Sequence, residues 1–276
     1  MENSQQHAQA ETPTSNFFTG SIPRNYDTYM GPVLLNPYAI DLAGRIKQHG
    51  KIEVLELAAG TGIVTRYLLQ ALPNADIAAT DISEDMMNIA KETIASPKLY
   101  WANLDMAAIP FANDSFDLIV CQFGLMFVPD KQKALSEMHR VLKPGGQLLF
   151  NTWGNIAENP MWQISFGLFK QVFGEMPVPM QQSPFALTDL EEIKQLLTEA
   201  NFTTTKAEEV RKTTQVETAK SAAQRFLLTA PTLAQKPEFY PDLLSQLEKR
   251  LAENLGDNPL VAPMMALVFE ATKAGN

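Results

Sequence analysis

The stretch "VLELAAGTG", residues 54–62, decides the fold of this chain. The overlapping run "IEVLEL" at 52–57 combines β-branched and leucine residues, which is typical of a strand buried on both faces of a sheet. Small residues follow it, and a helical pattern begins at 64–72. Gly60 and Gly62 permit unusual backbone dihedrals and close approach of the chain to a ligand. The stretch therefore predicts a strand, a tight turn and a helix, with a ligand at the turn.

The alternation of strand and helix continues to about residue 153. Further apolar runs predict strands, and segments with helical spacing predict the helices between them. The expected strands after the first are 76–80, 98–103, 116–123 and 147–153, and the expected helices are 64–72, 83–95 and 131–142. Strands joined through helices require right-handed crossovers, so we expect an α/β fold with a parallel, doubly wound sheet.

Segments on either side fall outside this alternation. Upstream, residues 25–48 are amphipathic and predict a helix that breaks near Gly31 and Pro32. Downstream, the expected elements are a helix at 188–200, a strand at 203–210, helices at 218–228 and 242–254, and a last strand at 264–272. We expect one domain over 17–276, with a flexible tail at 1–16, an N-terminal helical lid segment at 17–48 and a helical cap insertion at 154–186.

Composition limits the partners. The formal net charge is −9 and the Lys and Arg residues are scattered, so we expect no nucleic-acid partner. We also expect no metal site and a small molecule as the partner. The longest apolar region, 116–128, is interrupted by polar residues and is too short to span a bilayer. The single cysteine, Cys121, has no partner for an intramolecular disulfide, which is consistent with a reducing compartment. We expect a cytoplasmic monomer or homodimer.

The carboxylate of Glu56 narrows the choice of ligand. A pyrophosphate would be repelled by an acidic side chain at the end of the first strand, and no Lys follows Gly62 as a P-loop requires. A ligand with an ammonium group and a sulfonium centre reverses the sign of this interaction. Asp81, nineteen residues beyond Gly62, can accept hydrogen bonds from ribose hydroxyls in either kind of nucleoside site. An NAD(P)-dependent oxidoreductase therefore stays as the alternative.

Several motifs together resemble the class I S-adenosylmethionine-dependent methyltransferases. They are "VLELAAGTG", "ATDISEDMM", "NLDMAAIPFANDSFDLIV" and "MHRVLKPGG", in this order and spacing. The likeness covers about 25–152 and is greatest to the branch of the ubiquinone/menaquinone-biosynthesis methyltransferases. It implies a Rossmann-like seven-stranded sheet of order 3-2-1-4-5-7-6 whose last strand in sequence, 264–272, is antiparallel. It also implies S-adenosyl-L-methionine as the cofactor.

The resemblance assigns cofactor contacts to particular residues. It implies that one set of residues contacts the methionine end, the ribose and the adenine of the cofactor and forms the floor under its methyl group, and that the N-terminal segment contributes to this set. These residues are Tyr26, Glu56, Ala58, Gly60, Gly62, Asp81, Ile82, Met86, Asp105, Met106, Gln122 and Phe123. Ala58 departs from the pattern, since many relatives have glycine there.

The chemistry of methyl transfer needs few catalytic groups. A sulfonium methyl is already an activated electrophile, so alignment of the acceptor and exclusion of water are the main requirements. None of the three histidines, His7, His49 and His139, is well placed to act as a general base, and we assign no catalytic residue. Gln122-Phe123-Gly124-Leu125 stands where enzymes that methylate adenine or glutamine nitrogen carry Asn/Asp-Pro-Pro-Tyr/Phe, which argues against those acceptors.

An aromatic helix face at 162–173 suggests the acceptor. Trp162, Phe166, Phe169 and Phe173 fall on one face, either as core or as the wall of a pocket for an apolar or aromatic molecule. The candidate acceptor residues are Tyr29, Trp153, Trp162 and Phe166. We therefore expect methyl transfer to oxygen or carbon of a small apolar or aromatic acceptor, with a non-catalytic adenosyl-binding protein as a further alternative.

Overall fold

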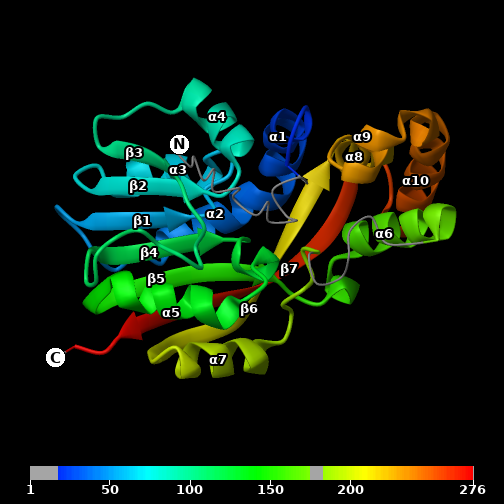
Figure 1. The fold of residues 1–276 in the computed structure, drawn as a ribbon. Coiled ribbons are helices and arrows are strands. Elements are labelled where there is room, and N and C mark those ends of the chain that lie inside the picture. Colours follow the sequence, from blue (N-terminus) through cyan, green and yellow to red (C-terminus); the bar gives the residue numbers. More distant parts are fainter. Residues whose placement is uncertain (1–17, 175–182, 276) are drawn as a thin grey trace, which may run out of the picture.

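The computed structural model describes residues 18–174 and 183–275, and the tail expected at 1–16 lies outside them. Seven strands form one sheet in the order β3-β2-β1-β4-β5-β7-β6, which confirms the expected order (Figure 1). The strands are β1 (Glu53–Leu57), β2 (Asp76–Asp81), β3 (Leu99–Asn103), β4 (Phe116–Gln122), β5 (Leu142–Trp153), β6 (Phe202–Val216) and β7 (Leu260–Lys273).

Parallel pairing brings the carboxyl ends of the central strands together. Leu55 of β1 is in register with Ala78 of β2 on one side and with Ile119 of β4 on the other. Strand β7 runs antiparallel between β5 and β6, as expected. The apolar side chains of β1 and β4 are buried because helices cover both faces of the sheet, and the exposed or half-buried positions are Glu53, Asp117 and Gln122.

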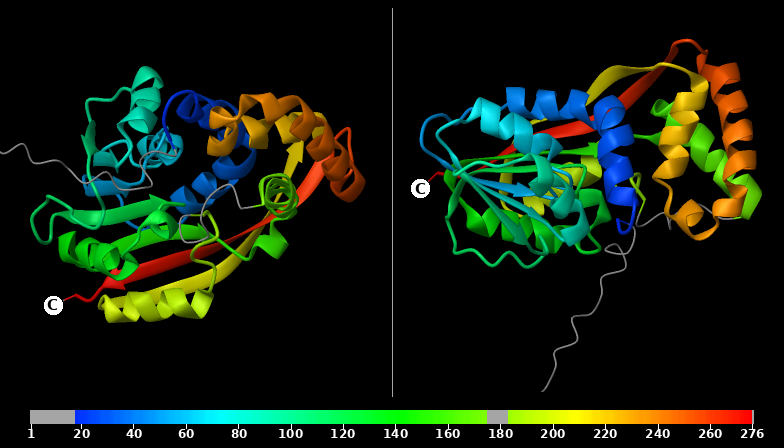
Figure 2. Two further views of the ribbon diagram at one scale, coloured as in Figure 1. Left: turned by 45° about the vertical axis from the view of Figure 1, so that its right-hand side comes forward. Right: turned by 90° about the horizontal axis from the view of Figure 1, so that it is seen from above.

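The helices lie in two layers. Helices α2 (Asn36–Gly44), α3 (Ile63–Ala71) and α4 (Glu84–Thr93) lie on one side of the sheet, and α5 (Lys131–Val141) and α7 (Leu190–Glu199) lie on the other (Figures 1 and 2). Side chains cap the starts of two of these helices: the Ser83 hydroxyl accepts a hydrogen bond from Met86 N at α4, and the Asp130 carboxylate accepts one from Lys133 N at α5.

The N-terminal segment is helical without interruption from Ile22 to Gly44, which corrects the expected break near Gly31 and Pro32. Helix α1 (Ile22–Asn25) continues directly into a π-helix, η2 (Tyr26–Leu35), and then into α2. Pro32 lies inside η2. In an α-helix its ring would clash with the carbonyl four residues earlier, whereas the wider π turn accommodates it. The proline therefore changes the helix type instead of ending the helix.

The helical cap is larger than the insertion expected at 154–186. Strands β6 and β7 are longer than expected: β7 residues Leu260–Met265 pair only with β6, because β5 meets β7 from Ala266 onward. Around the end of this ribbon lie α6 (Pro160–Phe173), α8 (Ala219–Leu228), α9 (Pro231–Gln235) and α10 (Tyr240–Leu255) (Figures 1 and 2). Part of the expected insertion, 175–182, lies outside the described residues.

Side chains anchor the cap to the sheet. The Asn159 amide donates to Met265 O and accepts from Met265 N, which fixes the start of α6 on β7. Leu243, Leu247 and Leu251 of α10 are buried at a spacing of four residues and form the inward face of that helix. The structure has no described helix that is long and apolar enough to cross a membrane.

Candidate active site

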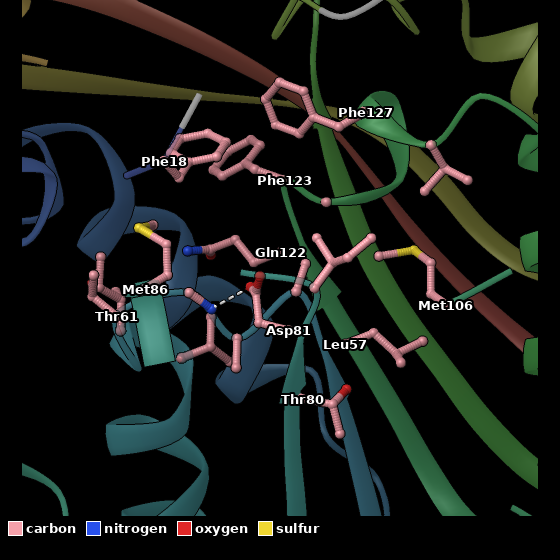
Figure 3. Close-up of a pocket in the computed structure, with 18 of the residues that line it drawn as sticks. Phe18, Leu57, Thr61, Thr80, Asp81, Met86, Met106, Gln122, Phe123 and Phe127 are labelled. Carbon is pink, nitrogen blue, oxygen red and sulfur yellow. Dashed lines mark hydrogen bonds between the residues drawn. The ribbon is translucent and has the colours of Figure 1, made fainter. Parts of the chain in front are cut away.

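A pocket opens at the carboxyl ends of β1, β2 and β4, where a doubly wound sheet binds its ligand (Figure 3). It holds about 1060 Å³ of space, its open mouth included. Its described lining residues are Phe18, Tyr26, Leu35, Leu57, Ala58, Ala59, Gly60, Thr61, Ile63, Val64, Thr80, Asp81, Ile82, Met86, Leu104, Asp105, Met106, Gln122, Phe123, Gly124, Phe127, Val128 and Pro129. All the cofactor residues expected from the sequence are among them except Glu56 and Gly62.

The two glycines of the loop have different roles. Both adopt left-handed backbone, with φ of +57° at Gly60 and +79° at Gly62. Gly60 faces the pocket, and its N–H donates a 2.8 Å hydrogen bond to Asp81 Oδ2. A Cβ on Gly62 would lie 2.3 Å from Ile94 Cδ1, so this glycine permits close packing of α3 against the end of α4. Its place behind the wall corrects the expectation that it lines the pocket.

Asp81 is the central polar group of the pocket. Its second oxygen, Oδ1, accepts a 2.7 Å hydrogen bond from Ser83 N, so both carboxylate oxygens are oriented by backbone donors. Burial raises the pKa of Asp81, and these donors counteract the rise. Each carboxylate oxygen keeps accepting capacity toward the pocket. Figure 3 shows the carboxylate between the glycine loop and Gln122, with the rings of Phe18 and Phe123 beyond them.

Glu56 departs from its expected place at the ligand. The side chain is 2% exposed, and its Oε2 accepts a 2.7 Å hydrogen bond from the Thr65 hydroxyl of α3. The Thr80 hydroxyl of β2 donates to Glu56 O. Burial is the largest cause that raises the pKa of Glu56, to about 8. The carboxyl group therefore joins β1 to α3 beneath the loop, where it is not in the pocket wall.

The remaining polar atoms fit a cationic nucleoside better than a dinucleotide. Gln122 Oε1 and Thr61 Oγ1 are buried without a hydrogen-bond partner, and both residues line the pocket. None of the described lining residues is Lys, Arg or His, so a pyrophosphate would have no cation to neutralise it. Ile82, Met86 and Met106 supply apolar surface for a base. An adenosyl group that carries an ammonium and a sulfonium matches this set of residues.

A second pocket of about 920 Å³, its mouth included, adjoins the first. Its described lining residues are Phe18, Tyr26, Met30, Leu34, Leu35, Phe123, Met126, Phe127, Trp153, Trp162, Ser165, Phe166, Phe169, Pro184, Phe226, Thr229, Ala230 and Pro231. The residues common to both pockets are Phe18, Tyr26, Leu35, Phe123 and Phe127. The two pockets therefore share a wall of mostly aromatic side chains.

Three of the four expected acceptor residues meet in this second pocket: Trp153, Trp162 and Phe166. Tyr29 is not in the wall of either pocket, and its carbonyl accepts a 3.0 Å hydrogen bond from Arg225 Nη1. Phe18, Phe127 and Phe226 also line this pocket and were not predicted from the sequence. No local pattern marks Phe226, because it reaches the pocket only through the packing of α8 on the β6–β7 ribbon.

Aromatic contacts build the second pocket. Trp162 packs edge to face on Phe226 and Phe166, with ring centroids 4.9 and 5.5 Å apart. Phe123 stacks on Trp153 at 4.2 Å with an interplanar angle of 8°. The backbone of Phe123 has a φ of +50°, which is strained for a bulky residue, and Phe123 N donates to Asn151 Oδ1. This strained residue stands exactly where the two pockets meet.

The second pocket is uncharged. Its described lining residues include no Asp, Glu, Lys, Arg or His. The Ser165 hydroxyl donates to Met161 O within α6, so it is already engaged. Trp162 Nε1 is buried and has no hydrogen-bond partner. Burial and the nearby charge of Asp81 raise the pKa of the Tyr26 phenol, which stays neutral.

Comparisons with known proteins agree with this site. The family described as "Methyltransferase domain" matches residues 54–146. The ubiquinone/menaquinone biosynthesis C-methyltransferase UbiE of Pasteurella multocida (strain Pm70) is 30% identical over 181 residues, which are 60% of this chain and 66% of the relative. The demethylmenaquinone methyltransferase of Staphylococcus aureus (strain JH9) is 33% identical over 162 residues, 54% of this chain and 67% of the relative. The chain thus matches about two thirds of the length of each.

A solved structure extends the likeness of the fold. Phosphoethanolamine N-methyltransferase 2 of Haemonchus contortus, in complex with S-adenosyl-L-methionine, has a TM-score of 0.59 and 20% identity. The match covers 95% of this chain and 60% of that one. The protein described here is thus an enzyme of the class I S-adenosyl-L-methionine-dependent methyltransferases, in the branch of the ubiquinone/menaquinone-biosynthesis methyltransferases, with S-adenosyl-L-methionine as its cofactor.

Proposed function

We propose that this enzyme transfers a methyl group to a ring carbon of a small, neutral, oxygen-bearing aromatic acceptor of the quinol type. The observation that carries the proposal is the uncharged aromatic pocket that shares its wall with the cofactor pocket. A flat apolar ring fits such a pocket, whereas a phosphorylated, amino-acid or carboxylate acceptor would lose its hydration without gaining a partner. The names of the two curated relatives, a C-methyltransferase and a demethylmenaquinone methyltransferase, support carbon as the methylated atom.

The residues of the first pocket hold the cofactor in this proposal. S-adenosyl-L-methionine supplies an activated methyl group. Asp81 accepts hydrogen bonds from the ribose, and Gln122 Oε1 and Thr61 Oγ1 are acceptors for the remaining polar groups. Ile82 and Met86 pack on the base. The absence of Lys, Arg and His from the described wall keeps a positively charged ligand free of repulsion.

The second pocket positions the acceptor and excludes water. No described side chain there is a general base, because the lining has no Asp, Glu, Lys or His and the Tyr26 phenol is neutral. The acceptor must therefore contribute its own reactivity, as an electron-rich hydroxylated ring does. An electron pair of the ring forms the new carbon–carbon bond, and the electrons of the broken carbon–sulfur bond stay on sulfur, which becomes a neutral thioether. The ring carbon then loses its proton to solvent water as the product leaves the pocket.

Trp162 adds a polar contact to this arrangement. Buried indole N–H groups ordinarily have a partner, and that of Trp162 has none. An oxygen on the acceptor ring would satisfy it. This preference separates quinols and phenols from plain hydrocarbons of the same size.

A turnover assay tests the proposal. The enzyme is incubated with S-adenosyl-L-methionine and 1,4-naphthohydroquinone kept reduced, and the product is examined by mass spectrometry and NMR. We expect one added methyl group on a ring carbon. The matched acceptor 1,4-dihydroxy-2-naphthoate, which adds one carboxylate, should react at least tenfold more slowly. Methylation only at oxygen, or preference for the carboxylated ring, would contradict the proposal.

A further inference from the structure

The π-helix η2 supplies walls to both pockets. Tyr26 and Leu35 line the cofactor pocket and the acceptor pocket alike, while Met30 and Leu34 line the acceptor pocket only. These four residues come from one helical segment at positions 26, 30, 34 and 35. The two shared residues stand at its opposite ends, nine positions apart.

An α-helix would not present these residues in this way. With 3.6 residues per turn, nine positions amount to about two and a half turns, so Leu35 would face away from Tyr26. The i→i+5 hydrogen bonds of a π-helix place residues four and five apart above one another. Asn36 N donates to Gly31 O in that pattern at the end of η2. The π register is therefore what turns Tyr26 and Leu35 toward the same cavity.

The sequence and the neighbouring elements both maintain this register. Pro32 disfavours the tighter α turn, and Gly31 lets η2 approach α3, where an added Cβ would lie 3.0 Å from Ile63 Cδ1. Side chains from elsewhere donate to carbonyls along η2. The Thr214 hydroxyl of β6 donates to Val33 O at 2.7 Å, and Gln122 Nε2 of the cofactor pocket reaches Leu35 O at 3.5 Å.

We infer that the π register of η2 determines acceptor specificity by placing Leu35 at the junction of the two pockets. Leu35 is a specificity-determining residue that contacts both ligands, and Thr214 is a positioning residue that holds the register through the Val33 carbonyl. The inference rests on the proposed function only in taking the second pocket as the acceptor site. The inference adds that the π register of η2, and not a catalytic group, couples cofactor binding to the choice of acceptor.

Neighbouring leucines supply the matched test. Leu35→Ala is compared with Leu34→Ala by calorimetric titration with S-adenosylhomocysteine and by the KM for 1,4-naphthohydroquinone. We expect Leu35→Ala to weaken both roughly tenfold, because one side chain is removed from both walls. Leu34→Ala should raise the KM alone. An unchanged S-adenosylhomocysteine affinity in Leu35→Ala would overturn the inference. If either alanine variant fails to fold, Leu35→Met and Leu34→Met are compared in the same way.

A second pair of variants tests the register itself. Thr214→Val keeps the shape of the side chain but removes the donor to Val33 O, and Thr214→Ser keeps the donor. We expect Thr214→Val to change S-adenosylhomocysteine affinity and acceptor KM together, and Thr214→Ser to restore both. Equal behaviour of the two variants would contradict the positioning role. The cofactor titrations need no acceptor, so loss of cofactor affinity without any quinol turnover would keep the inference and reject the proposed acceptor.

Discussion

The two pockets of this enzyme are built in different ways. The first lies at the carboxyl ends of three strands, where backbone groups, Gly60 N and Ser83 N, hold the Asp81 carboxylate. The second is formed by large side chains from η2, α6 and α8, with Trp162 and Phe226 in contact at 4.9 Å. A carboxylate held by backbone groups of a tight turn tolerates little change, whereas a pocket lined by side chains can be reshaped one residue at a time. Methyltransferases that share a cofactor can therefore differ in acceptor.

The largest expected effect is on the free energy of unfolding, and it is found by comparing two glycines, one behind the cofactor loop and one at the end of α6. Gly62 and Gly174 have nearly equal φ values, +79° and +76°. An added Cβ collides with Ile94 at Gly62 but meets no described atom within 4 Å at Gly174, the C-cap of α6. Gly62→Ala should lower the free energy of unfolding by about 4 kcal/mol, and Gly174→Ala by about 1 kcal/mol. Urea unfolding measures both, and equal losses would show that packing behind the loop is not tight.

Asp81→Asn should separate the pockets functionally. The substitution removes the charge that accepts hydrogen bonds from the ribose, which costs about 2–3 kcal/mol and weakens S-adenosylhomocysteine binding roughly 30- to 150-fold. The KM for the acceptor, measured at saturating cofactor, should change less than threefold. Calorimetric titration and initial rates provide the two numbers. A large rise in acceptor KM instead would mean that the two pockets are not independent at Asp81.

Glu56 gives the first region a dependence on pH. Its pKa of about 8 in the folded protein lies above the ordinary value of 4.5, so between these values the folded state binds more protons than the unfolded state. The contribution of Glu56 to the free energy of unfolding is greatest below about pH 4.5, falls as the pH rises to about 8, and is constant above that pH. Glu56→Gln keeps a hydrogen-bond acceptor for the Thr65 hydroxyl. Between pH 6 and 8 its free energy of unfolding should fall by about 2 kcal/mol less than that of the unchanged protein. Thermal or urea unfolding across this range gives the slope, and parallel curves would reject the assignment.

Trp162→Phe is expected to have the smallest effect, confined to the second pocket. It keeps an aromatic ring but removes the unpartnered N–H, so the KM for 1,4-naphthohydroquinone should rise by about three- to tenfold, or roughly 1 kcal/mol. The affinity for S-adenosylhomocysteine should not change. Trp101→Phe, on β3 and outside both pockets, is the matched control. A weaker cofactor affinity in Trp162→Phe would place the indole in the first pocket.

The prediction from sequence succeeded where neighbours in the chain are neighbours in space. The strand and turn at 53–62, the carboxylate Asp81 at the end of β2 and the floor residues Gln122 and Phe123 all line or support the first pocket as expected. The strand order came from the resemblance to the family. Glu56 was misplaced because a strand residue can point either into the pocket or behind it, and one buried hydroxyl, that of Thr65, decides between them.

The prediction was weaker for the second pocket. Trp153, Trp162 and Phe166 were expected there, but Tyr29 was not brought to the wall. Phe226 was missed because its position depends on the length of the β6–β7 ribbon. The spacing of apolar residues in the sequence predicts which face of a helix is apolar, but it does not predict which element that face will pack against.

The sequence by itself determined the parallel sheet and the cofactor loop, because turn geometry and strand burial depend on residues a few positions apart, and its resemblance to a known family implied the cofactor. Only the tertiary structure decided the second pocket, which joins residues near positions 30, 160 and 226. It also decided that Pro32 widens a helix instead of ending it, since Thr214 and Arg225 donate to the carbonyls of η2 from distant elements. Long-range packing selects among the local conformations that the sequence allows, and the second pocket depends on that selection.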